Sequence, residues 1–457
     1  MTEYITEPAR QTQVAAKCDL VVVGGSCTGV FAAVRAARLG LDVVLVERAN
    51  MLGGAAGTGL VNIWHTLMDT DDREQIIAGL TAETLDRLKS RGALTVQNNR
   101  SSTYNFNPYE LAILLDELVK SPYGSDSTGQ GRIRLMLHTL FCTVVSESDR
   151  VSAVIVENQD GRSAIITDFV IDATGDGYAA RALGIESYTN GYIQPPTACF
   201  HMQGDMRGVD IGRLTALHGE EFGLSDDWGW STFVSGCENI TMRADWHIFG
   251  LRCDIADDLT KAELEGRRQA HAFVSKLNKY VEGRHYAITS LPSSLGLRET
   301  VHYKTRFQAT ELPLLTGKRY DAPVMNGTYP VDIHHSEGGG ISFRYLDGSE
   351  RTVYGKGTRT ETGSWRERLG YTGEPAKYYQ LPFDILVGNG WSNFIAVGRM
   401  LTADMSAHGA LRVMVNLNQL GEAAGVAAAL CRDGDIDLRL LDGKRVTETL
   451  KKGGSAL

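Results

Sequence analysis

The stretch VVVGGSCTGVFAAVRAARLGLDVVLVE, residues 21–47, restricts the possible folds more than any other part of the chain. Three valines run into a glycine-rich turn, a helix is expected over about 29–39, and Gly40 precedes a second strand at 43–46. A strand, a turn, a helix and a second strand within about 30 residues make a βαβ unit, whose two strands lie parallel. We therefore expect an α/β fold with a Rossmann-like central parallel sheet.

The turn itself is similar to the G-x-G-x-x-G phosphate-binding fingerprint, with Ser26 at the place of the middle glycine. Serine is small, and the N–H groups of a helix N-terminus still attract a pyrophosphate, so the site is expected to be retained. Glu47 ends the second strand 23 residues after Gly24, where a carboxylate accepts hydrogen bonds from ribose hydroxyls. The residues that we assign to this part of a cofactor site are Gly24, Gly25, Ser26, Cys27, Thr28, Gly29, Glu47 and Arg48.

Three further segments favour FAD over NAD as the cofactor. Residues 51–65 are too glycine-rich for a core helix, which indicates that a large ligand approaches their backbone, and residues 169–177 and 393–404 each predict a buried strand running into a tight turn. An NAD domain needs only its first βαβ units, whereas the longer FAD contacts chain from both ends of a sequence. These segments add Gly53, Gly54, Ala56, Gly57, Thr58, Ala173, Thr174, Gly175, Asp176, Gly398, Arg399 and Asp404, and the β-rich run 133–148 adds Cys142.

Outside these segments, the pattern predicts a helix that begins at Asn107, with Pro108 at its first position and Glu110 completing a capping box. Residues 121–131 have the composition of a surface loop, and the runs on either side of residue 150 predict a small added β-sheet.

The sequence changes character between about 190 and 375, where mixed strands and glycine-rich loops surround one helical pattern at 270–281. After residue 390 the α/β pattern returns with a helix of small residues at 417–431. We predict an FAD-binding domain made of residues 1–190 and 376–457, with an inserted α+β substrate domain at 191–375.

Composition limits the partners and the compartment. A net charge of −9 over 457 residues, without a block of like charge, argues against nucleic acid or an anionic membrane surface as the main partner. The seven cysteines show neither C-x-x-C pairs nor zinc-site spacing, so we expect reduced thiols and no metal site. The first 17 residues lack the apolar core of a signal peptide, and no apolar run is long enough to span a membrane. A soluble cytoplasmic protein is expected.

The glycine turn, Glu47, the A-T-G-D turn and the later G-R strand together resemble the two-dinucleotide-binding-domain flavoproteins of the glutathione-reductase-like class. GGAAGTGLVNIW, LGLRET at 295–300, YPVDIH at 329–334, LPFDILV at 381–387 and the segment 408–430 are more narrowly similar to a bacterial FAD-dependent oxidoreductase family. This resemblance covers nearly the whole chain and implies bound FAD and redox chemistry. The sequence departs from that family's pattern at Ser26 and in ETVHYK, where more basic residues are usual.

A more distant resemblance concerns His408, Gly409, Ala410, Arg412 and Asn416, which are similar to the H-G-A-x-R-x-x-x-N segment of succinate dehydrogenase and fumarate reductase flavoproteins. The resemblance implies that the arginine binds a substrate carboxylate and that the following helix points its N-terminus at the flavin. A helix N-terminus carries roughly half a positive charge and would stabilise an anionic reduced flavin. The cofactor assignment therefore also includes Arg412, Val413, Asn416 and Leu417, although residues 413–415 are not the glycines usual there.

The catalytic candidates are Arg412, His408 and Arg298. Arg412 is expected to anchor a substrate oxyanion or carboxylate, with a salt bridge to Glu422 as the structural alternative. His408 is a candidate proton donor or acceptor. Arg298 is a candidate to reach one face of the flavin, with a structural ion pair as the alternative. Arg298 and Glu299 are expected on opposite sides of a strand.

Two weaker candidates, His334 and His65, lie in loops that could reach the cleft.

These residues lead to the hypothesis of an FAD-dependent oxidoreductase that transfers a hydride between a small polar organic substrate and FAD in an interdomain cleft. The electron acceptor and the oligomeric state stay open. One alternative is an NAD-dependent dehydrogenase that uses only the N-terminal βαβ unit. Another is a non-catalytic flavin-binding or redox-sensing protein with Cys27 as its reactive group.

Overall fold

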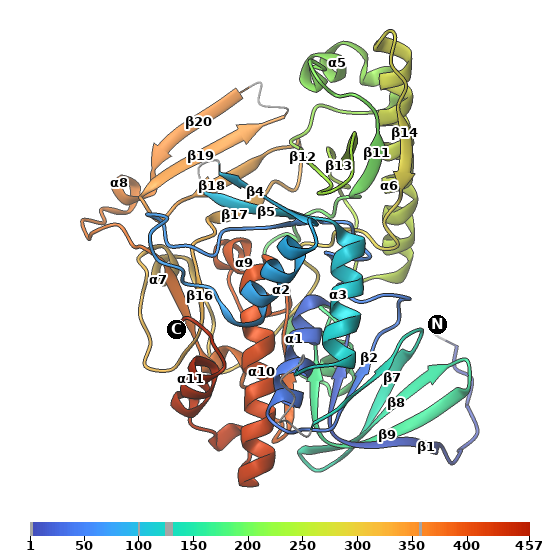
Figure 1. Cartoon of the computed structure of the whole chain (residues 1–457), viewed down its shortest axis with the longest axis vertical. Helices are drawn as coiled ribbons and strands as arrows, with labels where there is room; N and C mark the ends of the chain where they lie inside the picture. Colours follow the sequence, from blue (N-terminus) through green and yellow to red (C-terminus); the bar gives the residue numbers. More distant parts are fainter. Residues whose placement is uncertain (1–2, 99–100, 124–130, 356–358) are drawn as a thin grey trace.

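A computed structural model describes residues 3–98, 101–123, 131–355 and 359–457 (Figure 1). Its central sheet contains five parallel strands in the order β6, β2, β1, β9, β22. Their bounds are Ile133–Met136 for β6, Val43–Val46 for β2, Gln13–Val23 for β1, Gly161–Asp172 for β9 and Phe394–Ala396 for β22. The strands of the predicted βαβ unit pair in parallel from Leu20↔Val43 to Val23↔Val46. The predicted α/β fold with a central parallel sheet is confirmed.

The long strand β9 (Gly161–Asp172) pairs with two different strands besides β1 within one seven-stranded sheet. Its first half pairs antiparallel with β8 (Arg150–Asn158), which pairs with β7 (Leu140–Glu147). Its last three residues pair in parallel with β22, although more than 200 residues separate the two strands in the chain. The antiparallel strands are the small added sheet predicted around residue 150, and β22 brings the C-terminal segment into the central sheet.

Two helices cover one face of this sheet and pack directly on each other. They are α1 (Cys27–Arg38) and α10 (Met414–Gly434), which run side by side in Figure 1. A Cβ atom added at Gly421 would lie 2.2 Å from the carbonyl oxygen of Thr28, and one at Gly425 would lie 2.3 Å from that of Ala32. Only glycine allows this backbone approach, so the N-terminal and C-terminal segments meet at a contact that excludes side chains.

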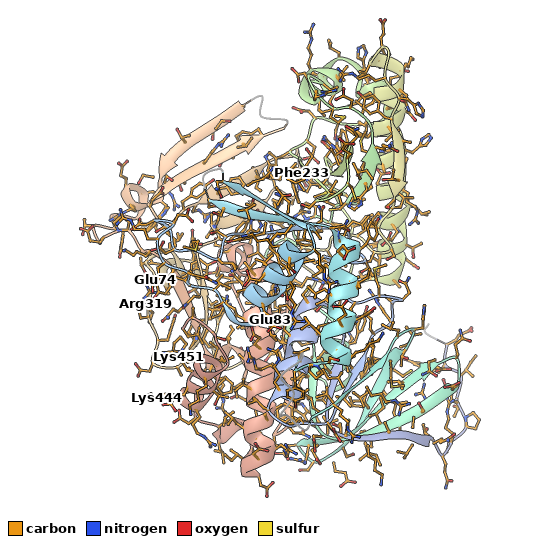
Figure 2. All side chains as sticks on the ribbon, viewed as in Figure 1. Glu74, Glu83, Phe233, Arg319, Lys444 and Lys451 are labelled. Carbon is orange, nitrogen blue, oxygen red and sulfur yellow. The ribbon has the colours of Figure 1, made fainter. Side chains whose placement is uncertain are left out.

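The helices α2 (Gly79–Ser90) and α3 (Pro108–Lys120) complete this layer. Glu83 of α2, labelled in Figure 2, accepts hydrogen bonds from the guanidinium of Arg38 at 2.8 and 2.9 Å, which ties α2 to the end of α1.

The predicted start of α3 is confirmed, because Asn107 caps it and accepts from the backbone N–H of Tyr109 at 3.0 Å. The predicted capping box is wrong: the N–H of Asn107 donates to the carbonyl of Ala93, and Glu110 forms an ion pair with Arg91 at 3.7 Å.

A second body of structure lies beyond the carboxyl ends of the parallel strands. Its four-stranded antiparallel sheet has the order β12 (Trp230–Phe233), β13 (Ile240–Ala244), β11 (Phe200–Gln203), β14 (Ala287–Ser290), and the long helix α6 (Ala256–Tyr280) runs beside it in Figure 1. The helical pattern predicted at 270–281 is the C-terminal half of α6. The helix α5 (Ile211–His218) lies at the far end of this body.

A three-stranded sheet from the N-terminal segment joins this second body. It has the order β3 (Ile63–Trp64), β5 (Ser102–Phe106), β4 (Leu94–Asn98). The side-chain amide of Asn62 donates to the carbonyl of Phe233, the residue labelled in Figure 2, and to that of Phe106, each at 3.0 Å. The chain therefore crosses between the two bodies immediately after the predicted cofactor-binding glycines.

The remaining elements frame the other side of the molecule. A four-stranded antiparallel sheet runs β17 (Val331–His334), β18 (Ile341–Arg344), β19 (Ser349–Tyr354), β20 (Arg359–Ser364). Two short pairs are β10 (Ser187–Tyr188) with β15 (His302–Tyr303) and β16 (Pro323–Gly327) with β21 (Tyr379–Pro382). The short helices are α4 (Tyr178–Ala182), α7 (Glu311–Leu315), α8 (Trp365–Leu369), α9 (Met405–Leu411) and α11 (Gly443–Lys452), with 3-10 turns at Glu220–Phe222, Phe383–Leu386 and Leu438–Leu440.

The boundaries at residues 190 and 375 stay a prediction. The N–H of Asn326, on β16, donates to the side chain of Gln419 on α10 at 3.1 Å, so part of the predicted insertion packs on the helix layer of the central sheet. The predicted surface loop at 121–131 lies mostly outside the described residues. No helix in the described ranges combines the length and apolarity needed to cross a membrane.

Candidate active site

Three glycine turns meet at the carboxyl end of the central sheet. Gly24 has a φ of +104°, and a Cβ atom there would lie 2.6 Å from the carbonyl oxygen of Ala173 in the turn after β9. Gly398, after β22, has a φ of +132°, and its Cβ position lies 3.7 Å from the Cα of Gly175. The turns predicted from three remote segments are thus neighbours, as one elongated ligand requires.

Ser26 begins helix α1 as its N-cap, because its hydroxyl oxygen accepts from the N–H of Gly29 at 3.4 Å. The serine at the middle position of the fingerprint therefore caps helix α1, and the N-terminus of this helix retains its partial positive charge. Glu47 accepts from the backbone N–H of Gly25 at 2.6 Å and from that of Ala49 at 2.7 Å. These two bonds fix its carboxylate beside the turn.

The glycine-rich segment after Glu47 lies against the same turn. The N–H of Gly53 donates to the carbonyl of Gly25 at 2.8 Å, and a Cβ atom at Gly54 would lie 2.8 Å from that of Ser26. Thr58 reaches the second body, since its carbonyl accepts from the N–H of Ser293 at 2.9 Å. Residues 53–58 thus lie between the nucleotide turn and the segment that leads into Arg298.

The other predicted cofactor residues occupy several environments. The carboxylate of Asp176 accepts from Arg399 at 2.5 Å and from Thr300 at 3.0 Å. Asp404 caps α9 through the N–H of Ala407 at 2.7 Å and accepts from the N–H of Glu311 at 3.0 Å.

Arg48 is exposed and donates to the hydroxyl of Tyr178 at 3.1 Å. Cys142 lies on β7 in the added sheet. Cys27 is 2% exposed, and burial raises the pKa of its thiol to about 12, which disfavours a thiolate and the redox-sensor alternative.

The N-terminus of α10 carries polar groups without a partner. Val413 precedes the helix and supplies no side-chain cap. Within the described ranges, Asn416 Oδ1 and both amide atoms of Asn418 are buried and make no hydrogen bond. Asn418 lies one turn before Gly421 on the face that meets α1, so its amide lies toward the nucleotide turn. The two helix N-termini suit the pyrophosphate of a dinucleotide, and the unpartnered amide of Asn418 can both donate and accept, as the ring and hydroxyls of FAD require.

Two arginines from different segments form a positive pair beside this helix end. Arg298 donates to the carbonyl of Pro195 and to the hydroxyl of Thr197, both at 2.7 Å. Burial together with the charge of Arg412 lowers the pKa of Arg298 to about 10. The Nε of Arg412 is buried and makes no hydrogen bond to any described residue, and its Nη2 lies 3.3 Å from a carboxylate oxygen of Asp332. This mutual repulsion and unused donor capacity favour an anion as the ligand.

A chain of buried acids and histidines approaches the arginine pair. His247 Nδ1 lies 2.9 Å from a carboxylate oxygen of Asp227, and His247 Nε2 lies 2.6 Å from His334 Nδ1. His334 Nε2 lies 3.2 Å from Asp332 Oδ1, which lies 3.3 Å from Arg412. All four members of the chain are at most 3% exposed. Burial and the charge of Arg298 hold the pKa of His334 well below its ordinary value.

The other oxygen of Asp332 accepts from the hydroxyl of Tyr329 at 2.5 Å. The ring of His65 lies against that of Tyr329 with centroids 4.1 Å apart, and burial lowers the pKa of His65 to about 4. The weaker candidates His65 and His334 therefore belong to the same site as Arg298 and Arg412. Asp332, Tyr329, His247 and Asp227 were missed, because only the fold brings these segments together.

His408 lies in a different cluster. Its Nε2 donates to the carbonyl of Arg399 at 3.0 Å, and its Nδ1 lies 3.9 Å from Glu299 Oε2. Glu299 Oε1 also lies 2.9 Å from His302 Nε2. The expectation of no metal site stays a prediction, and these three residues group their donor atoms within 4.8 Å.

Two further expectations are wrong. Arg412 does not pair with Glu422, whose carboxylate accepts from Arg35 and from the N–H of Leu80 at 3.0 Å. Arg298 and Glu299 do not lie on a strand; they precede β15, although their side chains do point to different partners.

The nucleotide cradle, the two helix N-termini and the polar cluster define the class as a flavin-dependent oxidoreductase. A family model described as FAD dependent oxidoreductase matches residues 19–450, so the chain belongs to that family and is an FAD-dependent enzyme. The narrower resemblances to glutathione-reductase-like and fumarate-reductase flavoproteins stay predictions.

Among curated proteins, the chain is similar to digeranylgeranylglycerophospholipid reductase 2 of Methanothermobacter thermautotrophicus, with 26% identity over 196 residues. That match covers 43% of this chain and about half (48%) of the relative. Among solved structures, it is similar to a geranylgeranyl bacteriochlorophyll reductase-like protein of Thermoplasma acidophilum, with 11% identity, a TM-score of 0.45 and coverage of 96% of this chain and 82% of that chain. A p-nitrophenol 4-monooxygenase of Pseudomonas putida has 11% identity and a TM-score of 0.42, with coverage of 95% and 84%.

Proposed function

We propose that the protein dehydrogenates, or in reverse reduces, a small carboxylate-bearing substrate that binds next to Arg298, Arg412 and His334. The observation that carries this proposal is the partly buried arginine pair, in which Nε of Arg412 has no partner among the described residues and lies next to an acid–histidine chain. Bound FAD supplies the hydride acceptor or donor. The protein's own residues then have to hold the substrate and move one proton.

The arginine pair is suited to hold the substrate carboxylate. Arg298 is fixed by Pro195 and Thr197, and Asp332 lies on one side of Arg412. A carboxylate in this place relieves the repulsion between the two guanidiniums and accepts from the Nε–H of Arg412, which lacks a partner among the described residues. The substrate is thereby oriented before any bond changes.

The histidine chain is suited to accept the substrate proton. Asp227 requires a proton on Nδ1 of His247, so Nε2 of neutral His247 is an acceptor, and His334 donates to it through Nδ1. Nε2 of neutral His334 then has no proton and lies 3.2 Å from Asp332 Oδ1, so its lone pair faces a carboxylate oxygen and this nitrogen is favoured as the place where a proton is taken up. A proton that arrives there from a substrate hydroxyl forms an imidazolium between Asp332 and the Asp227–His247 pair.

Anaerobic bleaching of the flavin absorbance tests this function. Small hydroxy acids are compared with the corresponding amides, which have the same shape and no charge. Bleaching by at least one acid and not by its amide is expected. Protein that binds no FAD, or that is bleached equally by acids and amides, contradicts the proposal. Small substituted and aromatic acids belong in the panel, because the geometry fixes the charged end and leaves the rest open.

A further inference from the structure

A second polar cluster lies behind the cofactor turns and is separate from the arginine pair. Glu299 and His302 come from the segment before and within β15, and His408 comes from α9. Glu299 is 2% exposed and both histidines are 0% exposed. A buried carboxylate with two buried imidazoles favours a positive charge between them, since hydrogen bonds alone compensate a buried anion only in part.

Hydrogen bonds to the backbone fix which ring nitrogens are free. His302 Nδ1 lies 2.8 Å from the carbonyl oxygen of Leu401, and His408 Nε2 lies 3.0 Å from that of Arg399. A carbonyl oxygen only accepts, so each of these nitrogens carries a proton. The other nitrogen of each neutral ring is a lone-pair donor, and both face the carboxylate of Glu299.

One of these lone pairs is unused. Within the described residues, His408 Nδ1 is buried and has no hydrogen-bond partner. His302 Nε2 lies 2.9 Å from Glu299 Oε1, an approach that repels unless a proton or a cation lies between the two atoms. The cluster thus combines two imidazole donors and a carboxylate around one point.

The surroundings match those of a metal site. Histidines that bind a metal usually donate their other N–H to a carbonyl or carboxylate, as both rings do here. Glu299 Oε2 accepts from the N–H of Gln194 at 3.0 Å, which orients the carboxylate. The side-chain amide of Asn190 lies 3.0 Å from Glu299 Oε1 and 3.2 Å from His302 Nε2, and turning that amide over places its oxygen as a fourth donor.

We propose that Glu299, His302 and His408 bind one divalent transition-metal ion of the zinc type in a closed structural site, with Asn190 as the fourth ligand. Two nitrogen and two oxygen donors suit such an ion in tetrahedral geometry. Because the cluster is closed to solvent, the ion enters while the chain folds. It ties the segment 398–412, which contributes to the cofactor site, to the segment 299–302 next to Arg298.

The test measures metal in the intact protein. The chain is expressed once in medium with zinc and once in minimal medium with cobalt, purified without chelator and analysed by elemental mass spectrometry and visible absorption. About one ion per chain is expected in both preparations, with the d–d absorption of tetrahedral Co²⁺ in the second. Wild-type protein with less than about a tenth of an ion per chain in both preparations overturns the proposal and leaves a proton on His302 as the positive charge.

Variants assign the ion to these residues. Glu299→Gln keeps the shape of the side chain and removes its charge, and His408→Gln removes one nitrogen. Both are expected to reduce the metal content at least tenfold, whereas His201→Gln, a change at a buried histidine outside the cluster, is expected to leave it unchanged. Unchanged content in Glu299→Gln overturns the assignment. If both cluster variants fail to fold, the cobalt absorption of the wild type decides, because a site elsewhere with thiolate ligands shows intense charge-transfer bands that an N/O site lacks.

Discussion

The imidazoles of His247 and His334 lie edge to face, with Nε2 of the first 2.6 Å from Nδ1 of the second. No solvent separates them, and each ring has an aspartate on its outer side. A proton gained by His334 can therefore be shared with His247, and the negative charge of Asp227 helps to stabilise that proton.

His334→Gln is expected to lower the rate of flavin reduction by about 10² to 10⁴, because the proton acceptor is removed while the arginines remain. Stopped-flow absorbance under anaerobic conditions measures this rate and the substrate Kd separately. His335→Gln is the matched control, since the neighbouring histidine hydrogen-bonds to Ser342 at 2.9 Å. Equal rates in the wild type and His334→Gln would remove the histidine from the mechanism.

Arg412→Met is expected to weaken the binding of a carboxylate substrate by about 1.5 to 3 kcal/mol, roughly 10- to 150-fold in Kd, because a charge-assisted hydrogen bond is lost. The binding of the amide analogue should be weakened much less by the same substitution. FAD content and melting temperature show whether the cofactor site is intact, and Arg213→Met at an exposed position is the control. Loss of affinity that is the same for acid and amide would mean that Arg412 acts only in packing.

Ser26→Gly is expected to keep FAD bound, since replacing a serine cap by glycine costs only a few tenths of a kcal/mol. Gly24→Val should abolish FAD binding, because φ is +104° and the added Cβ would lie 2.6 Å from Ala173 O. The ratio of flavin to protein absorbance after gel filtration reports both outcomes. An FAD-saturated Gly24→Val protein would contradict the placement of the nucleotide turn.

Gly425→Ala is expected to destabilise the protein by about 1 to 3 kcal/mol, because the new Cβ would lie 2.3 Å from the carbonyl oxygen of Ala32 and force α1 and α10 apart. Thermal melts with and without added FAD measure the loss. Gly191→Ala is the control, as its Cβ position has no described atom within 4 Å. Equal melting temperatures for the two variants would show that the helices tolerate separation.

The free energy of unfolding should decrease as the pH is lowered from 7 to 5, in part because of His201. Burial lowers the pKa of this histidine from 6.5 to about 4, so in that range the unfolded chain binds the proton and the folded protein does not. The cost is about 2 kcal/mol at pH 5, and it disappears as the pH rises above 6.5. Urea denaturation of wild type and His201→Gln at both pH values checks this, since the variant should show a smaller pH dependence; parallel curves would exclude His201.

Local patterns were enough to predict much of the cofactor side. The βαβ unit, the start of α3 at Asn107 and the turns at 173–176 and 398–399 each have a signature within a few residues. Their convergence follows from parallel topology, because the carboxyl ends of parallel strands lie at one edge of a sheet.

The substrate side depends on contacts that no local pattern encodes. Asp227, His247 and His334 come from separate segments, and Arg412 takes Asp332 instead of Glu422 because Arg35 lies closer to Glu422 across the α1–α10 contact. Hydrophobic periodicity shows which positions interrupt the apolar pattern. It does not show which remote residue each of these polar side chains contacts. The cluster of Glu299, His302 and His408 was likewise hidden, because His408 is more than 100 residues away from the other two members in the sequence.

The glycine contact between α1 and α10 also sets when the enzyme can acquire its cofactor. About 390 residues separate Thr28 from Gly421, so the N-terminal βαβ unit leaves the ribosome long before the helix that covers it. During synthesis, the small-residue face of α1 is not covered by α10 until residues 421–425 have been made. A chain truncated before α10 is therefore expected to lack this contact and to retain FAD poorly.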